Sequence, residues 1–177
     1  IEDVRVELSP GFCAWTGEIP AFGADHLELM LQANPGEPAR PLRKVASGGE
    51  MARTMLALKT VLAAHDPVRT LVVFDEIDAN VGGRLGDVLG QKLASLGATH
   101  QVLCVTHLPQ VASYAAHQWT IRKASTGKKT ATTIAELSGA EARVEELALM
   151  LRGESRSETT RKEAAEMLRA AERLRAG

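Results

Sequence analysis

Two short apolar runs separated by a helical pattern constrain the fold of this chain more than any other feature of its sequence. Residues 70–74 and 101–105 are nearly continuous apolar segments, and between them apolar residues recur at helical spacing, at Leu85, Val88, Leu89 and Leu93. Strands buried on both faces of a parallel sheet have this composition. The strand–helix–strand order predicts a βαβ unit, so we expect an α/β fold with a mostly parallel sheet flanked by helices.

Two acidic residues, Asp75 and Glu76, follow the first apolar run directly. In open α/β sheets, ligands bind at the edge formed by the carboxyl ends of the strands. Two unpaired carboxylates there are costly to bury unless they hold a cation or a proton. Nucleotide hydrolysis uses such a pair, because one carboxylate serves Mg²⁺ and the next polarises the attacking water. The alternative is a polar turn after a core strand.

The segment Ser47-Gly48-Gly49-Glu50 opens a predicted helix that runs to about Ala64, with an apolar face of Met51, Met55, Leu58 and Leu62. A helix N-terminus presents free N–H groups and the positive end of the helix dipole. The glycines allow a phosphate to approach the backbone closely, and the serine hydroxyl adds a donor. The alternative is a plain helix cap with a glycine turn.

Thr106 and His107 follow the second apolar run, and we expect them at the same sheet edge as the acidic pair. A histidine at that position can reach the terminal phosphate of a nucleotide. The alternative is a structural histidine at a strand end.

The remainder of the chain predicts smaller elements. Residues 1–33 alternate in polarity between turn residues and predict antiparallel strands, and residues 34–44 predict a loop. Residues 118–123 and 130–136 predict a hairpin, whose basic residues could touch phosphates or be solvated: Arg122, Lys123, Lys128 and Lys129.

Two helices are predicted at the C-terminal end. A capping box of Ser138 and Glu141 opens the first, and Gly153 is placed to end it. The second is expected from about Ser157 to Gly177.

Composition narrows the class of protein. The 177 residues can bury one core, and the net charge of -1 excludes a broadly basic surface but not a local patch. Cys13 and Cys104 form no CxxC pair, so neither zinc nor a disulfide framework is predicted, and Cys104 is expected to be buried. We expect a cytosolic protein, because no apolar run approaches the ~18 residues of a membrane span. The start at Ile1 instead of Met predicts a piece of a longer chain.

The order of the motifs resembles that of ABC/SMC-class ATPases, in which a signature loop, a Walker B strand and an H-loop follow one another. Glu50 stands where transporter ATPases usually have Gln, and Phe74-Asp75-Glu76-Ile77-Asp78 is similar to the SMC-class Walker B. Between about residues 34 and 153, three segments resemble the RecN family of DNA repair ATPases: Asn34-Pro35-Gly36-Glu37, Asp75-Glu76-Ile77-Asp78-Ala79-Asn80-Val81-Gly82-Gly83 and Val105-Thr106-His107-Leu108-Pro109-Gln110-Val111-Ala112.

This resemblance implies that residues 1–177 are the C-terminal portion of a P-loop NTPase-like ABC head with an antiparallel strand layer. It implies ATP and Mg²⁺ as cofactors, with Asp75 serving Mg²⁺ through water. Glu76 would be the catalytic base and His107 the switch residue that senses the γ-phosphate. The signature loop would contact the ATP of an opposing head through Ser47, Gly48, Gly49 and Glu50. Residues 78–83 would form the D-loop at the dimer interface, beginning with Asp78, Ala79 and Asn80.

The sequence holds no GxxxxGK[ST] phosphate loop. The resemblance places that Walker A loop, the Q-loop and a coiled coil elsewhere in a complete protein, so this chain by itself is expected to lack ATPase activity. The complete protein would repair DNA double-strand breaks after DNA damage and take part in recombination at the nucleoid. Its partners would be its own N-terminal lobe, a second head in a homodimer, and DNA, with no membrane.

Two alternatives belong to other functional classes. A nucleotide-binding domain of an ABC transporter shares the motif order, but Glu50 and the sequence from Asp75 to Asp78 argue against it. A non-catalytic interaction fragment is supported by the absent phosphate loop.

Overall fold

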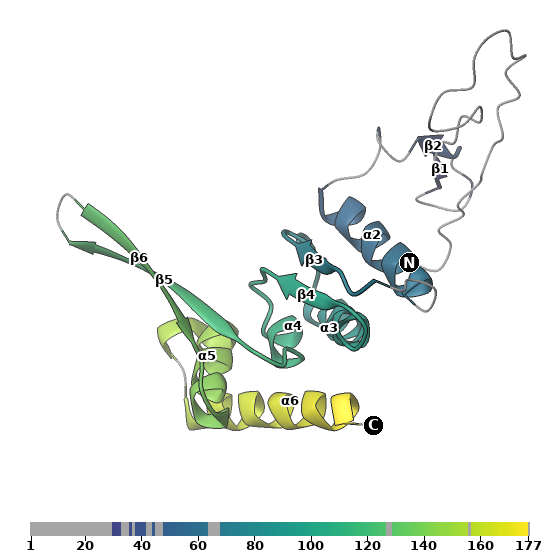
Figure 1. Cartoon of the computed structure of the whole chain (residues 1–177). Coiled ribbons are helices and arrows are strands. Elements are labelled where there is room, and N and C mark those ends of the chain that lie inside the picture. The colour runs from purple at the N-terminus through teal and green to yellow at the C-terminus, as the bar shows by residue number, and fades with distance from the viewer. Residues whose placement is uncertain are drawn as a thin grey trace, which may run out of the picture. The chain divides into compact units, whose positions relative to one another are not determined.

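A computed structural model describes residues 30–32, 36, 38–41, 44, 48–63, 68–126, 129–155 and 157–176. The chain divides between Met51 and Ala52 into two units. Figure 1 shows the helices and strands, coloured from purple at the N-terminus to yellow at the C-terminus.

In the first unit, β1 (Met30–Leu31) forms an antiparallel pair with β2 (Arg40–Pro41). β1 lies where alternating polarity predicted a strand, so that prediction is confirmed at these residues. β2 lies inside the segment predicted as a loop. The sequence did not predict this strand, because two residues are too few to show an alternating pattern. The other strands predicted in residues 1–33 lie outside the part of the chain that the structure describes.

The helix predicted after the glycine pair is confirmed as α2 (Gly48–Leu62). Its buried side is not the predicted stripe, because Leu56 is buried while Met51, Met55 and Leu62 are exposed. Ala52 and Ala63 pack with Leu56 against the core. Helical periodicity could not select the face, since this helix is apolar on most of its circumference.

The predicted βαβ unit is confirmed by β3 (Leu71–Phe74), α3 (Gly83–Gly97) and β4 (Gln101–Cys104). The two strands are parallel neighbours, with Leu71 opposite Gln101 and Phe74 opposite Cys104. This register brings the carboxyl ends of both strands level with each other.

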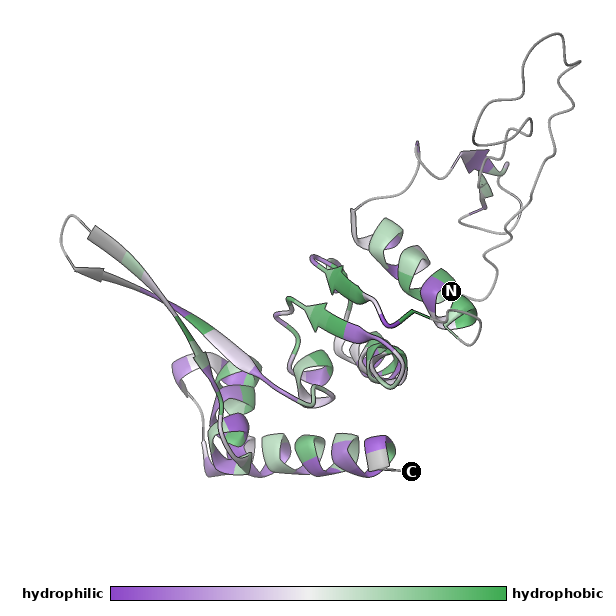
Figure 2. Ribbon diagram, in the orientation of Figure 1, coloured by the Kyte–Doolittle hydropathy of each residue, from purple (hydrophilic) through white to green (hydrophobic). Residues whose placement is uncertain are grey.

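One face of the β3–β4 pair is exposed, which corrects the expectation of strands covered on both faces. Figure 2 shows β3 and most of β4 coloured as hydrophobic. Val72, Val102 and Cys104 pack against the core with buried Phe74, whereas the alternate residues are 49–59% exposed: Leu71, Val73, Leu103 and Val105. Successive side chains of a strand point to opposite faces. In the described part of the chain, α2 and α3 supply core residues to one of those faces only.

Helix α3 turns a narrower face to the core than its sequence predicted. Its buried residues are Gly86, Leu89, Gly90, Leu93 and Leu96, while the predicted Leu85 and Val88 are 40% and 49% exposed. The short helix α4 (Pro109–Ser113) packs close to α3. A Cβ placed on Gly90 would lie 2.4 Å from Cδ2 of Tyr114, so this contact requires glycine.

The predicted hairpin is confirmed as β5 (Trp119–Thr126) and β6 (Lys129–Glu136), with Trp119 opposite Glu136. The connecting residues 127 and 128 lie outside the described ranges. The hairpin bonds to α5 (Ala140–Arg152) through Glu146, which accepts hydrogen bonds from Oγ1 of Thr120 at 3.3 Å and Nη2 of Arg122 at 2.5 Å.

The capping box predicted for α5 is wrong. The cap is Gly139, with a φ of 86°, and no side chain caps the helix. The predicted end at Gly153 is confirmed, since this residue has a φ of 62° and begins one turn of 3₁₀ helix, η1 (Gly153–Ser155). Glycine adopts such left-handed geometry at low cost, which explains its use at both ends.

The last predicted helix is confirmed as α6 (Glu158–Ala176). Oγ of Ser157 accepts the N–H of Thr160 at 3.3 Å and so caps its first turn. α5 and α6 share a second core cluster, whose fully buried members are small or branched: Leu147, Ala148, Ala164 and Leu168.

The α/β class is confirmed, with parallel strands, packed helices and antiparallel pairs in one chain. The parallel sheet has two strands in the described residues. None of the helices resolved in those residues is long and apolar enough to cross a membrane.

Candidate active site

The structure places two of the sequence motifs at one edge of the parallel pair. Asp75 and Glu76 leave the end of β3, and Thr106 and His107 leave the end of β4. The pairing continues past the strand ends, because the N–H of Val105 donates to the carbonyl of Phe74 at 2.9 Å. The acidic pair and the histidine therefore lie on adjacent strand ends, at the edge where open α/β sheets bind ligands.

A tight turn presents the acidic pair. Both carboxylates are exposed, so neither carries the burial cost that the sequence suggested. Glu76 has a φ of 56°, and its carbonyl accepts the N–H of Ala79 at 3.0 Å. A non-glycine residue in the left-handed region stores strain of about 1–3 kcal/mol, and such residues cluster at functional sites. The turn also holds Asn80 at a φ of 59°, in a conformation that asparagine tolerates.

Asp78 connects this turn to the end of β4. The residue is buried, and its Oδ2 accepts hydrogen bonds from Oγ1 of Thr106 at 2.6 Å and the backbone N–H of His107 at 2.9 Å. Nδ1 of His107 lies 3.1 Å from the same oxygen. Oγ1 of Thr106 in turn accepts the N–H of Leu108 at 3.0 Å. Asp78 thus bonds within its own chain, while Ala79 is half-buried and Asn80 exposed.

Opposing effects set the charge state of Asp78. Burial by itself would raise the pKa of its carboxyl group. The hydrogen bonds from Thr106 and from the N–H of His107, with the electrostatic attraction of the His107 ring, outweigh burial and hold the pKa of Asp78 below its ordinary value of 3.8. The carboxylate is therefore ionised at neutral pH and acts as an acceptor only.

Arg53 is a site residue that the sequence reasoning missed. It lies on α2, and its Nη1 donates to the carbonyls of Ile77 at 3.0 Å and Ala79 at 3.2 Å, on either side of Asp78. A signal was present, because Arg53 is a cation on a helix whose nearby residues Ala52 and Met55 are apolar. Its partners are carbonyl groups distant in sequence, however, and no local pattern identifies them.

The glycine segment lies at the division between the two units. Ser47 lies outside the residues that the structure describes, while Gly48, Gly49 and Glu50 form the first turn of α2. Gly49 is buried, and Gly48 and Glu50 are exposed.

The carboxylate at the end of β3 is a suitable ligand for Mg²⁺. Asp75 offers an exposed carboxylate, whose Oδ1 accepts the N–H of Glu76 at 3.0 Å. The described residues contain no cluster of three or more His, Cys, Asp or Glu side chains that could hold a metal. Mg²⁺ is commonly bound by one or two carboxylates, several waters and substrate phosphates, and not by a cage of protein ligands. Asp75 can serve such an ion.

The basic hairpin cluster is only partly available for phosphate contacts. Arg122 is paired with Glu146, and Lys123 is exposed. Lys128 lies outside the described residues.

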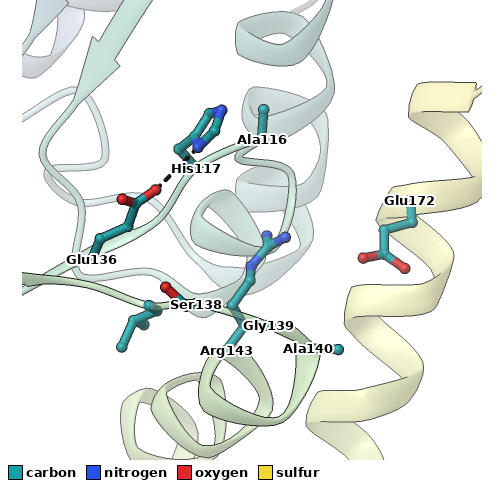
Figure 3. Close-up of a pocket in the computed structure, with 9 residues that line it drawn as sticks. Ala116, His117, Glu136, Ser138, Gly139, Ala140, Arg143 and Glu172 are labelled. Carbon is teal, nitrogen blue, oxygen red and sulfur yellow. Dashed lines mark hydrogen bonds and ion pairs between the residues drawn. The ribbon is translucent and has the colours of Figure 1, made fainter.

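A pocket elsewhere in the second unit is built around a buried arginine (Figure 3). Arg143 on α5 donates to Oε1 of Gln118 and to the carbonyls of Ser113 and Ala115. Burial, followed by the nearby charge of Arg175, lowers the pKa of Arg143 from its ordinary value. Figure 3 also shows the exposed pair of His117 and Glu136 at the pocket. The pocket contains none of the residues predicted for the site, and its arginine joins the end of α4 to α5.

Comparison with known proteins identifies close relatives. The chain is 47% identical over 156 residues to the DNA repair protein RecN of Treponema pallidum (strain Nichols), covering 88% of this chain and 27% of the relative. It is 49% identical over 149 residues to RecN of Streptomyces coelicolor, covering 84% and 26%. RecN of Mycobacterium leprae (strain TN) is 46% identical over 166 residues, covering 94% and 27%. The chain thus spans about a quarter of the length of these curated relatives.

Two further comparisons add little. No protein-family model matches the chain. A solved structure from work on "ATP-driven dimerization and DNA stimulated activation of SMC ATPases" is 19% identical with a TM-score of 0.43, covering 64% of this chain and 66% of that chain. The identities of 46–49% over 84–94% of the sequence do decide the family. The chain belongs to the RecN family of DNA repair proteins.

Proposed function

We propose that this chain supplies one part of an ATP-hydrolysing head that acts in DNA double-strand-break repair and recombination. The observation that carries the proposal is the placement of Asp75, Glu76 and His107 on adjacent parallel strand ends. The DNA repair context is supported by relatives named DNA repair protein RecN.

Each of these residues has a chemical part in the proposed reaction. Glu76 is the catalytic base, because its exposed carboxylate can accept a proton from the water that attacks the γ-phosphate. Asp75 holds Mg²⁺ through water, and the ion supplies positive charge that offsets the charge of the phosphates. As the imidazolium cation, in which both ring nitrogens donate, His107 hydrogen-bonds the γ-phosphate and reports its presence.

The rest of the site comes from other segments. The α- and β-phosphates require a Walker A loop, which this sequence lacks. We place that loop in the N-terminal lobe of the same protein. The exposed apolar face of the β3–β4 pair supports docking of that lobe, since apolar patches on sheets mark interaction surfaces.

In the proposed dimer, two heads face each other with ATP between them. The signature segment, which comprises Ser47, Gly48, Gly49 and Glu50, contacts the ATP of the opposing head. Asn80 is exposed and available at the D-loop interface. ATP binding engages the heads and hydrolysis releases them, on DNA in the cytoplasm at the nucleoid.

The test uses a full-length RecN protein that carries this sequence. Glu76→Gln should reduce ATP turnover by roughly 10²- to 10⁴-fold, the usual contribution of a general base, and leave ATP binding intact. The amide is close to the same size but cannot take the proton. The matched control is Glu163→Gln on the exposed side of α6, which should turn over ATP normally. Turnover that persists in Glu76→Gln would exclude Glu76 as the base.

Engagement in trans has its own test. Ser47→Arg should leave ATP binding by the single head intact and prevent head dimerisation. A mixture of Ser47→Arg and Glu76→Gln proteins forms dimers with one doubly damaged site and one intact site. Hydrolysis should partly recover in this mixture. Loss of ATP affinity in the monomeric Ser47→Arg protein would place the segment in its own head's site instead.

The 177-residue chain alone should not hydrolyse ATP, because nothing in it replaces the phosphate loop. Turnover by the purified chain that is unaffected by Glu76→Gln would come from a contaminating enzyme. Turnover that is lost in Glu76→Gln would show that the chain holds a complete site.

A further inference from the structure

One short segment, Thr106 and His107, binds the buried carboxylate of Asp78. Oγ1 of Thr106, the backbone N–H of His107 and Nδ1 of His107 lie 2.6, 2.9 and 3.1 Å from Oδ2 of Asp78. Asp78 follows β3 and its partners follow β4, so these bonds join two strand ends that are 28 residues or more apart in sequence. A buried carboxylate must be satisfied by such donors, which makes the arrangement costly to change.

The contact with Nδ1 has a chemical consequence for the His107 ring. A carboxylate can only accept, so Nδ1 must carry a proton to bond to it. In a neutral ring the other nitrogen, Nε2, then has a free lone pair. The His107 side chain is 71% exposed, whereas that of Asp78 is 4% exposed. Asp78 therefore holds the buried side of a ring whose other side is open.

We propose that Asp78 is a positioning residue for His107: it fixes the ring orientation and keeps the proton on Nδ1, so that Nε2 is the nitrogen presented at the strand edge. Histidines that bind metals or act in catalysis are oriented in the same way, by the group bonded to the second ring nitrogen. The consequence for ATP hydrolysis rests on the proposed function, but the ring geometry does not.

The first measurement needs no ATP and no variant of Asp78. In the 177-residue chain with ¹⁵N-labelled histidine, a two-bond ¹H–¹⁵N spectrum at a pH where the ring is neutral distinguishes the two tautomers. The signals of His107 are those that disappear in His107→Gln. The expected result is a predominant Nδ1-protonated form at His107. A predominant Nε2-protonated form overturns the proposal.

Two variants test the cause. Asp78→Asn removes the negative charge and replaces one carboxylate oxygen by an NH₂ group, which is a donor. This variant should shift His107 towards the Nε2-protonated form. The matched control is Glu136→Gln, which changes the acceptor of the exposed pair between His117 and Glu136, 3.2 Å apart. It should leave the His107 signals unchanged. A folded Asp78→Asn chain with an unaltered His107 tautomer overturns the proposal.

A second pair of variants separates positioning from general stability. Thr106→Ser keeps the hydroxyl that bonds Asp78, and Thr106→Val removes it. If Asp78 is held by its neighbours in order to orient the ring, the tautomer should be preserved in Thr106→Ser and disturbed in Thr106→Val. Equal spectra for the two variants would contradict the proposed network.

Activity of a full-length protein distinguishes this inference from the proposed function. Asp78→Asn should lower kcat by roughly 10- to 100-fold, as losses of orienting partners do, and leave the KM for ATP close to normal. A changed tautomer with unchanged kcat would support the positioning of His107 and count against its role in hydrolysis. A reduced kcat with an unchanged tautomer would overturn the positioning and leave the proposed function standing.

Discussion

The carbonyl oxygen of Ile77 accepts a hydrogen bond from Nη1 of Arg53 at 3.0 Å, which ties a helix to the turn that carries the acidic pair. Ile77 is fully buried, and the same guanidinium nitrogen also binds the carbonyl of Ala79. Arg53 of α2 therefore binds the backbone of the turn, and the side chain of Asp78 binds the turn to Thr106 and His107. Replacing either Arg53 or Asp78 should therefore lower the stability of the chain.

Replacement of Arg53 by Met should lower the free energy of unfolding by about 1–3 kcal/mol, because two carbonyls lose a charged donor. Chemical denaturation of the 177-residue chain measures the change. Arg69→Met is the matched control, since Arg69 also binds two carbonyls, those of Ala98 and Thr99, but at an exposed position. Its effect should stay within about 0.5 kcal/mol. Equal losses of unfolding free energy in both variants would contradict a particular role of Arg53 in holding the turn.

The close approach of α3 and α4 predicts intolerance of a single methyl group. Gly90→Ala would place a Cβ 2.4 Å from the ring of buried Tyr114, and should cost about 1–3 kcal/mol of stability. Gly97→Ala, in the same helix, meets nothing within 4 Å and should be neutral or stabilising by up to about 1 kcal/mol. Thermal unfolding compares the two. A Gly90→Ala chain as stable as Gly97→Ala would contradict the packing.

The lowered pKa of Asp78 predicts a pH-dependent contribution to stability. Because the folded-state pKa lies below the ordinary value of 3.8, the ionised group stabilises the fold at neutral pH, and this contribution is lost as the pH falls through the folded pKa. The stability difference between the natural chain and Asp78→Asn should shrink as the pH falls below about 4. Denaturant unfolding across this range measures it. A difference that stays flat to about pH 2 would contradict the prediction.

Cys104 should be unreactive in the folded chain. Burial, followed by the nearby charges of Asp78 and Asp75, raises the pKa of its thiol to about 12, and the thiolate is the reactive form. In a Cys13→Ser background, Ellman's reagent at pH 8 should label Cys104 roughly a thousandfold more slowly in the folded chain than in denaturant. Similar labelling rates in both states would show that the Cys104 thiol is accessible to the reagent and that its pKa is not raised.

The sequence determined the elements and their order because local patterns specify them. The apolar runs predicted β3 and β4, and the glycine at 153 predicted the end of α5, since only local backbone geometry was required. The acidic pair and His107 could be assigned to one sheet edge, because a βαβ unit makes its strands parallel. The family could also be identified from the motifs, and the relatives agree.

Tertiary structure decided which faces are buried and what each polar group bonds. Periodicity did not distinguish the two sides of α2, and it did not show that one face of β3 and β4 is exposed, since burial depends on which elements pack there. The partners of Arg53 are carbonyls 24 and 26 residues away, and those of Asp78 lie 28 and 29 residues away. Contacts at such separations leave no local signal in one sequence, because chain folding alone brings their atoms within hydrogen-bonding distance.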